Sequence, residues 1–383
     1  MQHRAGLVAI VTIVLQLLGC GPDPTVKRAD WPEIGVGIDK LGLTKALISE
    51  CCFRGYVRSI QLGNFDSDPE LEIAVVPQTG VYLFDAVSLK QKAKFDYQKP
   101  NGETLWFGTT PFLITSKNDF KIAMLGGGYG DIGLLDRAGM ELWKFKPNPA
   151  LSPNGMVVDD SVLGGPLFYV CDRGTIYKLD ANGKVVWKIT ESASYITLVR
   201  EEDGSDAGFA TADSGSKTLK IWSSAGKLRQ HLELPLNPDG LEFVSAKGVS
   251  GFVIKSGQQI AFIDRTGKYR FTHSYGDVPV YHGPAAALVR LAPQQPPLLA
   301  VRSTSRSATG KSVLSLFSLE GTHLYEEYLE GGPALGVVPI RNENRDRLLV
   351  GEGTTKLWAY EKASPNNSIQ TGPAQPPATD FKR

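Results

Sequence analysis

The chain has 383 residues, 42% of them hydrophobic, and a formal charge of +1 from 41 basic and 40 acidic side chains. The sequence shows no electrostatic footprint of nucleic-acid binding, and no basic run marks an anionic membrane surface. The 41 Gly and 24 Pro are numerous, as expected where many short strands need many turns. The length exceeds that of an average domain, although all-β folds often reach it as a single unit.

Residues 1–19 have the composition of a secretory signal. A positively charged start precedes an apolar stretch that is too short to span a membrane. The segment ends in LLGC at residues 17–20, which resembles the lipobox of bacterial lipoproteins. The resemblance implies cleavage before Cys20, lipidation of that cysteine and anchoring in a membrane, and Gly21 favours the outer membrane. The alternative is an ordinary secretory signal with an incidental cysteine.

The two ends of the chain differ in composition from the part between them. After the lipidated Cys20, residues 20–30 are expected to form a flexible tether. Residues 364–383 are polar and rich in proline, which predicts disorder. The folded part is therefore expected at residues 31–363.

One short pattern returns between residues 80 and 361. It consists of an alternating strand, an Asp or Ser, a glycine three residues later and an aromatic residue seven later. Its copies read LLDRAGMELW around Asp136, KLDANGKVVW around Asp180, KIWSSAGKLRQ around Ser223, FIDRTGKYRF around Asp264 and LFSLEGTHLY around Ser318. A looser copy surrounds Asp85, and a truncated one ends near Glu361. The alternation indicates strands, and Asp-x-x-Gly predicts a tight turn whose carboxylate accepts hydrogen bonds from backbone amides.

The anchor residues of these copies are 51, 44, 43, 41, 54 and 43 residues apart. All-strand repeats of this length predict the four-stranded antiparallel blades of an all-β propeller, and seven anchors predict seven blades. The first repeat is expected near 56–98, and the last, near 333–361, has only three strands. A strand from residues 31–53 is expected to complete that blade and close the ring, with a short helix at Leu41–Glu50 as the alternative. The aromatic residues of the pattern are expected to pack between neighbouring sheets.

Two stretches resemble known propeller families. LDANGKVVW resembles the repeat of quinoprotein-type (PQQ-like) propellers, which also occurs in a non-enzymatic outer-membrane lipoprotein of the β-barrel assembly machinery. GNFDSDPELEIAVV at residues 63–76 resembles the FG-GAP or VCBS repeat of integrin-like propellers. The resemblance covers most of residues 56–361 and implies an architecture, whereas function depends on sites within it.

The loop at residues 64–72 is a candidate calcium site. Asn64, Asp66, Asp68 and Glu72 place oxygen ligands at alternate positions and then a carboxylate, which suits a hard cation. The FG-GAP resemblance implies that these four residues are Ca²⁺ ligands. Pro69 departs from the family because it stands where such loops usually have Gly, and it restricts the turn. The alternative is a polar hairpin whose carboxylates cap turn amides.

Three cysteines besides Cys20 would lie in an oxidising compartment. The adjacent Cys51 and Cys52 are candidates for a strained vicinal disulfide, or one of them for a bridge to Cys171. Buried unpaired thiols are the third possibility.

Catalytic motifs are weak throughout the chain. SRSATGKS at residues 305–312 lacks the first glycine of a phosphate-binding loop and precedes an alternating strand instead of a helix. Ser214 and Lys217 have the spacing of a penicillin-binding motif, but they join two expected strands. No catalytic or metal-binding spacing relates the four histidines that follow the signal, which are His231, His273, His282 and His323.

These observations predict a non-catalytic, membrane-anchored propeller that acts as a monomeric binding or scaffold module in the bacterial cell envelope. Its expected partner is another envelope protein or a glycan. One alternative is a carbohydrate-active or quinone-dependent enzyme, and the other is a calcium-dependent adhesion module that requires residues 64–72. Three or more carboxylate, His or Lys side chains converging in the axial channel would favour the enzyme.

Overall fold

The computed structural model describes residues 31–50, 56–97, 111–116, 119–126, 131–147, 153–161, 165–200, 208–246, 248–276, 285–304, 311–332 and 334–362. The predictions for Cys20, for residues 1–30 and for residues 364–383 lie outside these ranges, as do those for Cys51 and Cys52. Within the described part of the chain, no helix is long and apolar enough to cross a membrane.

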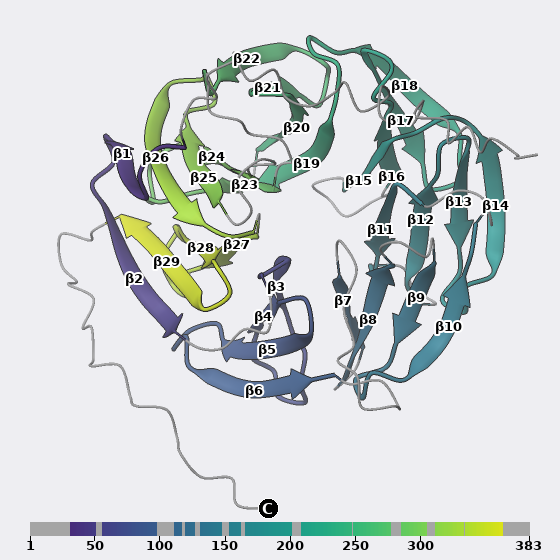
Figure 1. Ribbon diagram of the computed structural model, residues 1–383, viewed down its shortest axis with the longest axis horizontal. Helices are drawn as coiled ribbons and strands as arrows, with labels where there is room; N and C mark the ends of the chain where they lie inside the picture. Colours follow the sequence, from purple (N-terminus) through teal and green to yellow (C-terminus); the bar gives the residue numbers. More distant parts are fainter. Residues whose placement is uncertain are drawn as a thin grey trace, which may run out of the picture.

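Seven antiparallel sheets surround a central axis, which confirms the predicted seven-bladed propeller (Figure 1). Blades 1 and 2 contain β3 (Ser59–Gly63), β4 (Glu72–Val76), β5 (Gly80–Asp85) and β6 (Gln91–Asp96), then β7 (Phe112–Ser116), β8 (Asp119–Leu125), β9 (Ile132–Leu135) and β10 (Glu141–Phe145). Blades 3 and 4 contain β11 (Gly155–Asp159), β12 (Leu167–Cys171), β13 (Thr175–Leu179) and β14 (Val185–Thr190), then β15 (Tyr195–Val199), β16 (Gly208–Ala212), β17 (Thr218–Ser223) and β18 (Leu228–Glu233).

Blades 5 and 6 contain β19 (Gly240–Ala246), β20 (Val249–Ser256), β21 (Gln259–Asp264) and β22 (Tyr269–Ser274), then β23 (Ala285–Val289), β24 (Leu298–Thr304), β25 (Lys311–Phe317) and β26 (His323–Glu330). Blade 7 contains β27 (Leu335–Pro339), β28 (Asp346–Glu352) and β29 (Lys356–Lys362), and the first two strands of the chain are β1 (Gly35–Asp39) and β2 (Leu43–Glu50). The first strand of each repeat is the innermost one, and the fourth lies at the rim.

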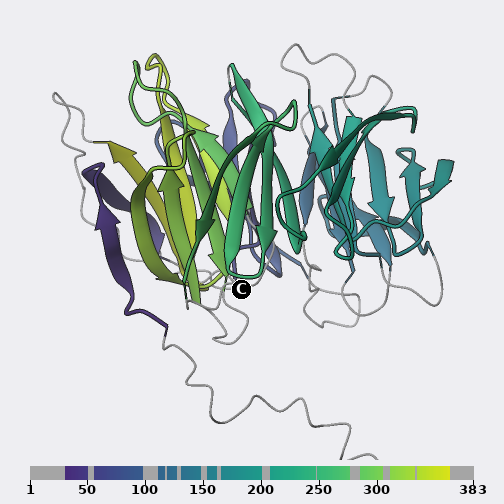
Figure 2. The same cartoon turned by 90° about the horizontal axis from the view of Figure 1, so that it is seen from above.

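The ring is closed by the N-terminal strand β2. It pairs with β29 from Leu43 opposite Lys362 to Glu50 opposite Lys356, so it supplies the missing fourth strand of blade 7. The predicted closure is confirmed, and the alternative of a helix at Leu41–Glu50 is wrong, because the unpaired edge of β29 offers this segment a hydrogen-bonding partner. Strand β1 continues to the neighbouring blade and pairs with β26, which gives blade 6 a fifth strand that the repeat did not predict. Figure 2 shows both strands at the rim of the disc.

A charge network around the buried Glu327 holds β2 in place. The Lys45 Nζ lies 2.7 Å from Oε1 of Glu327, whose side chain is 5% exposed. The other carboxylate oxygen accepts hydrogen bonds from the hydroxyls of Tyr325, at 2.7 Å, and Tyr360, at 2.8 Å. One carboxylate thus joins β2 to blades 6 and 7, with every partner hydrogen-bonded.

The turns follow the predicted chemistry. Oδ1 of Asp180 accepts hydrogen bonds from the amides of Asn182 and Lys184, at 2.9 Å each, and Gly183 has a φ of +75°. The indole of Trp143, from the preceding blade, lies 2.7 Å from where a Cβ at Gly183 would stand. The glycine is therefore required twice, for its backbone conformation and for the close approach of the neighbouring blade.

The same contact repeats from blade to blade, as predicted for the aromatic residues. Phe271 packs on Gly321 of the next blade. In the copy around Ser223, Gln230 stands in place of the aromatic residue. There Leu232 packs on Gly267, and Gln230 donates a hydrogen bond to the Thr266 carbonyl at 3.3 Å. Seven clusters of buried side chains result, each shared by two adjacent sheets, so the core forms a ring around the axis.

Candidate functional site

The innermost strands of the seven sheets enclose an axial cavity of about 870 Å³. Its lining draws on β3, β7, β11, β15, β19, β23 and β27 or on residues directly beside them, together with Leu125 at the end of β8. Most of the lining is apolar, with Phe112, Met156 and Leu241 as examples. A mainly apolar cavity of this size with few polar groups has the character of a small-molecule or peptide-binding site.

Most polar side chains of the wall are used to join neighbouring blades. Oε1 of Gln61 accepts a hydrogen bond from the Leu113 amide at 3.0 Å, and Oγ1 of Thr197 accepts one from the Phe243 amide at 3.0 Å. The amide of Asn154 donates to a carbonyl of the next blade in the same way. These groups fix the wall and leave few polar groups for a ligand.

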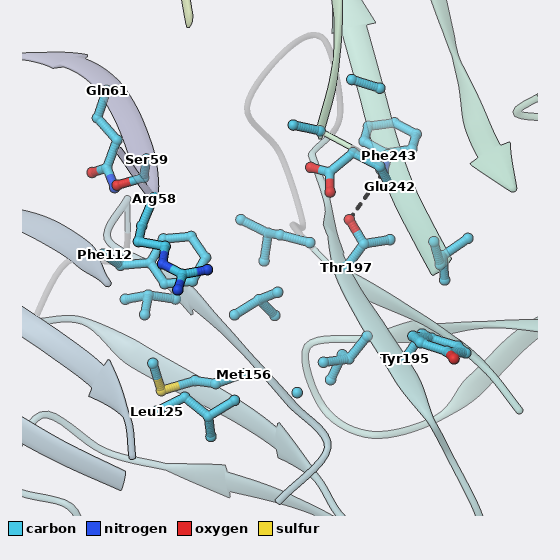
Figure 3. A pocket seen from close by; sticks show the side chains of 18 of the residues that line it. Arg58, Ser59, Gln61, Phe112, Leu125, Met156, Tyr195, Thr197, Glu242 and Phe243 are labelled. Atoms are coloured by element: carbon cyan, nitrogen blue, oxygen red, sulfur yellow. Dashed lines mark hydrogen bonds between the residues drawn. The ribbon is translucent and has the colours of Figure 1, made fainter. Parts of the chain in front are cut away.

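Arg58 is one of the groups that remain. It precedes β3, and its side chain points into the cavity (Figure 3). Its Nε is buried and has no hydrogen-bond partner among the described residues. Burial lowers the pKa of Arg58, an effect that the nearby Tyr56 opposes. Among the described residues no carboxylate pairs with this cation, although buried guanidinium groups usually have such a partner.

Glu242 faces the cavity from the opposite side (Figure 3). It lies on β19, and within the described part of the chain its carboxylate has no hydrogen-bond or ion-pair partner. Glu242 is half-buried in the cavity wall, and this burial raises its pKa to about 8. The carboxyl group therefore holds its proton at neutral pH and is able to donate a hydrogen bond.

The remaining charges of the channel neutralise each other. Arg200 Nη2 lies 2.7 Å from Oδ1 of Asp160, and the two side chains are 50% and 32% exposed. The described lining thus holds two carboxyl groups, one of which is already paired.

The raised pKa of Glu242 predicts a pH-dependent cost to folding. The folded chain keeps this proton up to about pH 8, whereas the unfolded chain releases it near the ordinary glutamate value. The contribution of Glu242 to the free energy of unfolding is therefore highest at acid pH, where both states hold the proton, and it falls as pH rises toward 8. We expect Glu242→Gln to raise the melting temperature relative to wild type at pH 9 and to leave it unchanged at pH 4, measured by calorimetry. The exposed Glu70→Gln is the control, and equal effects of both variants at pH 9 would contradict the prediction.

The sequence did not single out Arg58 or Glu242, although it carries a weak signal. Each is a charged residue in or next to the first strand of a repeat. In blades 6 and 7 the first strands, or residues next to them, present small apolar residues to the cavity instead, such as Ala285 and Ala334. Once the first strands are known to face the axis, such charges become candidates for ligand contacts.

The predicted calcium loop is assembled, and an ammonium group occupies it. Lys92 Nζ lies 2.7 Å from Asp66, 2.6 Å from Asp68 and 2.9 Å from Glu72, and hydrogen bonds to these carboxylates raise the pKa of Lys92. The ligand atoms of the three acidic residues lie within 4.8 Å of one another. Asn64 donates to the Asp68 carbonyl at 2.6 Å, which tightens the loop. The calcium site stays a prediction, and an ion there must displace the ammonium group.

The other candidate residues lie apart from the channel. Cys171 is a free thiol on the fully buried part of β12, and burial raises its pKa to about 12. Ser214 and Lys217 lie in the turn between β16 and β17, as expected of a hairpin. The last two residues of the SRSATGKS segment, Lys311 and Ser312, begin β25, so a strand stands where a phosphate-binding loop would need a helix, as predicted.

Comparison with known proteins places the chain by its fold. No family model matches it, and no curated protein is similar to it in sequence. A solved structure of BBS1N in complex with ARL6DN has a TM-score of 0.56 and 14% identity, over 86% of this chain and 99% of that one. A streptogramin B lyase has a TM-score of 0.54 and 15% identity, over 84% of this chain and 98% of that one. The virginiamycin B lyase of Staphylococcus aureus has a TM-score of 0.52 and 12% identity, over 83% of this chain and 98% of that one.

The similarity is one of fold. One of these propellers is bound to another protein and two are lyases, so the architecture alone does not determine the function. The propeller architecture that the FG-GAP and quinoprotein resemblances implied is present, but no family model for either repeat matches the chain.

Proposed function

We propose that this protein is a non-catalytic binding module, and that a carboxylate of its ligand enters the axial channel and pairs with Arg58. The observation that supports this is the buried Arg58 Nε, which has no partner among the described residues. A guanidinium group offers two parallel donors to a carboxylate, and burial strengthens such a pair. A ligand carboxylate would therefore satisfy a group that has no partner within the described part of the chain.

Glu242 supports an anionic ligand as well. Because its pKa lies at about 8, its carboxyl group is uncharged at neutral pH and does not repel an anion. The described lining holds Asp160 and Glu242 as its carboxyl groups, and Asp160 already pairs with Arg200.

The sequence also predicts where in the cell this binding would take place. Lipidation of Cys20 would anchor the propeller in the bacterial envelope, on the outer membrane, with residues 20–30 as its tether. In that compartment the carboxylate would come from a peptide of another envelope protein or from an acidic glycan. The two sources share the chemistry that Arg58 recognises.

Binding of carboxylate probes tests the proposal. We expect short peptides with a free C-terminal carboxylate, or uronic acid oligosaccharides, to bind the wild type, and their amidated or neutral counterparts to bind at least tenfold more weakly. Arg58→Met should weaken the binding of the carboxylate probes by about 10- to 100-fold, as for the loss of a charged hydrogen bond. Isothermal titration calorimetry measures both effects, and the probe class that binds identifies the source.

The matched control is Arg200→Met, which removes a channel arginine that already has Asp160 as its partner. It should leave the affinity within about twofold of the wild type. Equal affinity of wild type and Arg58→Met for every probe that binds would overturn the proposal.

A further inference from the structure

A second cluster of polar side chains lies away from the channel, between the outer strands of blades 5 and 6. It consists of His273 on β22 with His323 and Glu326 on β26. One ligand atom from each residue lies within 4.8 Å of the others. The two histidines are far apart in the sequence, and the packing of adjacent blades brings them together.

The His323 imidazole lies beside the Glu326 carboxylate. His323 Nε2 is buried, has no hydrogen-bond partner among the described residues, and lies 3.7 Å from Oε2 of Glu326, beyond hydrogen-bond length. The other oxygen, Oε1, accepts a hydrogen bond from the Tyr328 hydroxyl at 2.9 Å. The tyrosine thus fixes the carboxylate and leaves Oε2 facing the imidazole.

Aromatic packing holds the two imidazoles. Their ring centroids are 4.7 Å apart, and the Phe317 ring stacks on His323 with an interplanar angle of 21°. Burial lowers the pKa of both histidines, to about 4 for His273, whose pKa is lowered further by His323. For His323 the Glu326 carboxylate acts in the opposite direction. Neutral imidazole is the form that binds metal ions.

We propose that His273, His323 and Glu326 bind a divalent transition-metal ion of the zinc class and thereby link blades 5 and 6. Two imidazole nitrogens and one carboxylate oxygen form a known donor set for such ions, with the fourth position left to water. The Tyr328 hydrogen bond is the outer-shell contact that orients a ligating carboxylate. The ion would also satisfy the buried His323 Nε2.

Strand β1 lies beside this site, at the edge of β26. Ile38 pairs with Glu326, and a Cβ at Gly37 would lie 3.3 Å from Glu326 Oε1, so the glycine leaves room for the carboxylate. Lys40 Nζ donates to the His323 carbonyl at 3.0 Å. The His323 and Glu326 side chains remain 15% and 14% exposed, which leaves an ion a route from solvent.

Titration of the full chain with Zn²⁺ and Co²⁺, after dialysis against a chelator, tests this site. We expect Zn²⁺ to raise the melting temperature of the wild type and Co²⁺ to produce visible d–d absorption. His273→Gln and the near-isosteric Glu326→Gln should each weaken Co²⁺ affinity at least tenfold. Tyr328→Phe should weaken it about tenfold, since outer-shell contacts contribute that much or more.

The matched control is His231→Gln, an exposed histidine on β18, the corresponding strand of blade 4. It should leave metal affinity within about twofold of the wild type, and the metal-free melting temperature of each variant checks its folding. No shift of the wild-type melting temperature with Zn²⁺ would overturn the proposal. So would Co²⁺ affinity in folded Glu326→Gln that equals the wild type, because other groups would then hold the ion.

Discussion

Deletion of residues 31–50 should abolish the cooperative unfolding transition of this propeller. The deletion removes β2, the fourth strand of blade 7, and β1, the fifth strand of blade 6. It also removes Ile48 from the core between blades 7 and 1 and leaves the buried Glu327 without Lys45. An open ring would expose the edge of β29 and the apolar sides of two sheets, which favours aggregation.

The measurement is calorimetry of the deleted chain, alone and with a synthetic peptide of residues 33–50. We expect the peptide to restore a cooperative transition, because β2 is held in blade 7 by non-covalent contacts, namely its pairing with β29 and the Lys45–Glu327 ion pair. A peptide of the same composition in scrambled order is the control and should restore nothing. A deleted chain that melts within a few degrees of the wild type would contradict the role of β2 in closure.

Replacement of Arg302 by Leu should lower the free energy of unfolding by roughly 3 kcal/mol or more, because several buried acceptors lose their donor. The side chain is fully buried between blades 6 and 7. Its guanidinium donates to the carbonyl of Gly351, to the carbonyl of Glu330 at 3.2 Å and to Ser312 Oγ at 2.8 Å. Burial lowers the pKa of Arg302 to about 10, so the group stays charged at neutral pH.

Urea denaturation of Arg302→Leu and of Arg270→Leu measures this effect. Arg270 is 44% exposed and pairs with Asp264 at 2.8 Å, so its replacement should cost about 1 kcal/mol or less. Similar losses in the two variants would show that the buried arginine has no special role in joining the blades.

The fold was predictable because its signals are local. In the third repeat, for example, the turn at Asp180, the positive φ of Gly183 and the flanking strands are each determined by residues only a few positions apart. The closing strand followed from counting strands in the last repeat. Strand β1 was not predictable, because its pairing depends on the outer edge of β26, which becomes available only in the finished blade.

The sites were harder to predict because their residues come from separate blades. Arg58 and Glu242 are charged residues of the kind that half-exposed strands often carry, and only the ring geometry turns both toward one cavity. The loop of Asp66 and Asp68 was recognisable from its spacing, but the ammonium group among its carboxylates comes from β6. His273 and His323 have no sequence relation, and only the packing of blades 5 and 6 brings them together.

The pairing of β2 with β29 also constrains the synthesis of the protein. A ribosome that has made Leu43–Glu50 must continue to Lys362 before this strand finds its partner. At 5–20 residues per second that interval lasts roughly 15 to 60 s, during which the strand has no native neighbour. The polar residues Thr44, Lys45 and Glu50 interrupt its apolar positions and limit its pairing with other chains until β29 has been made.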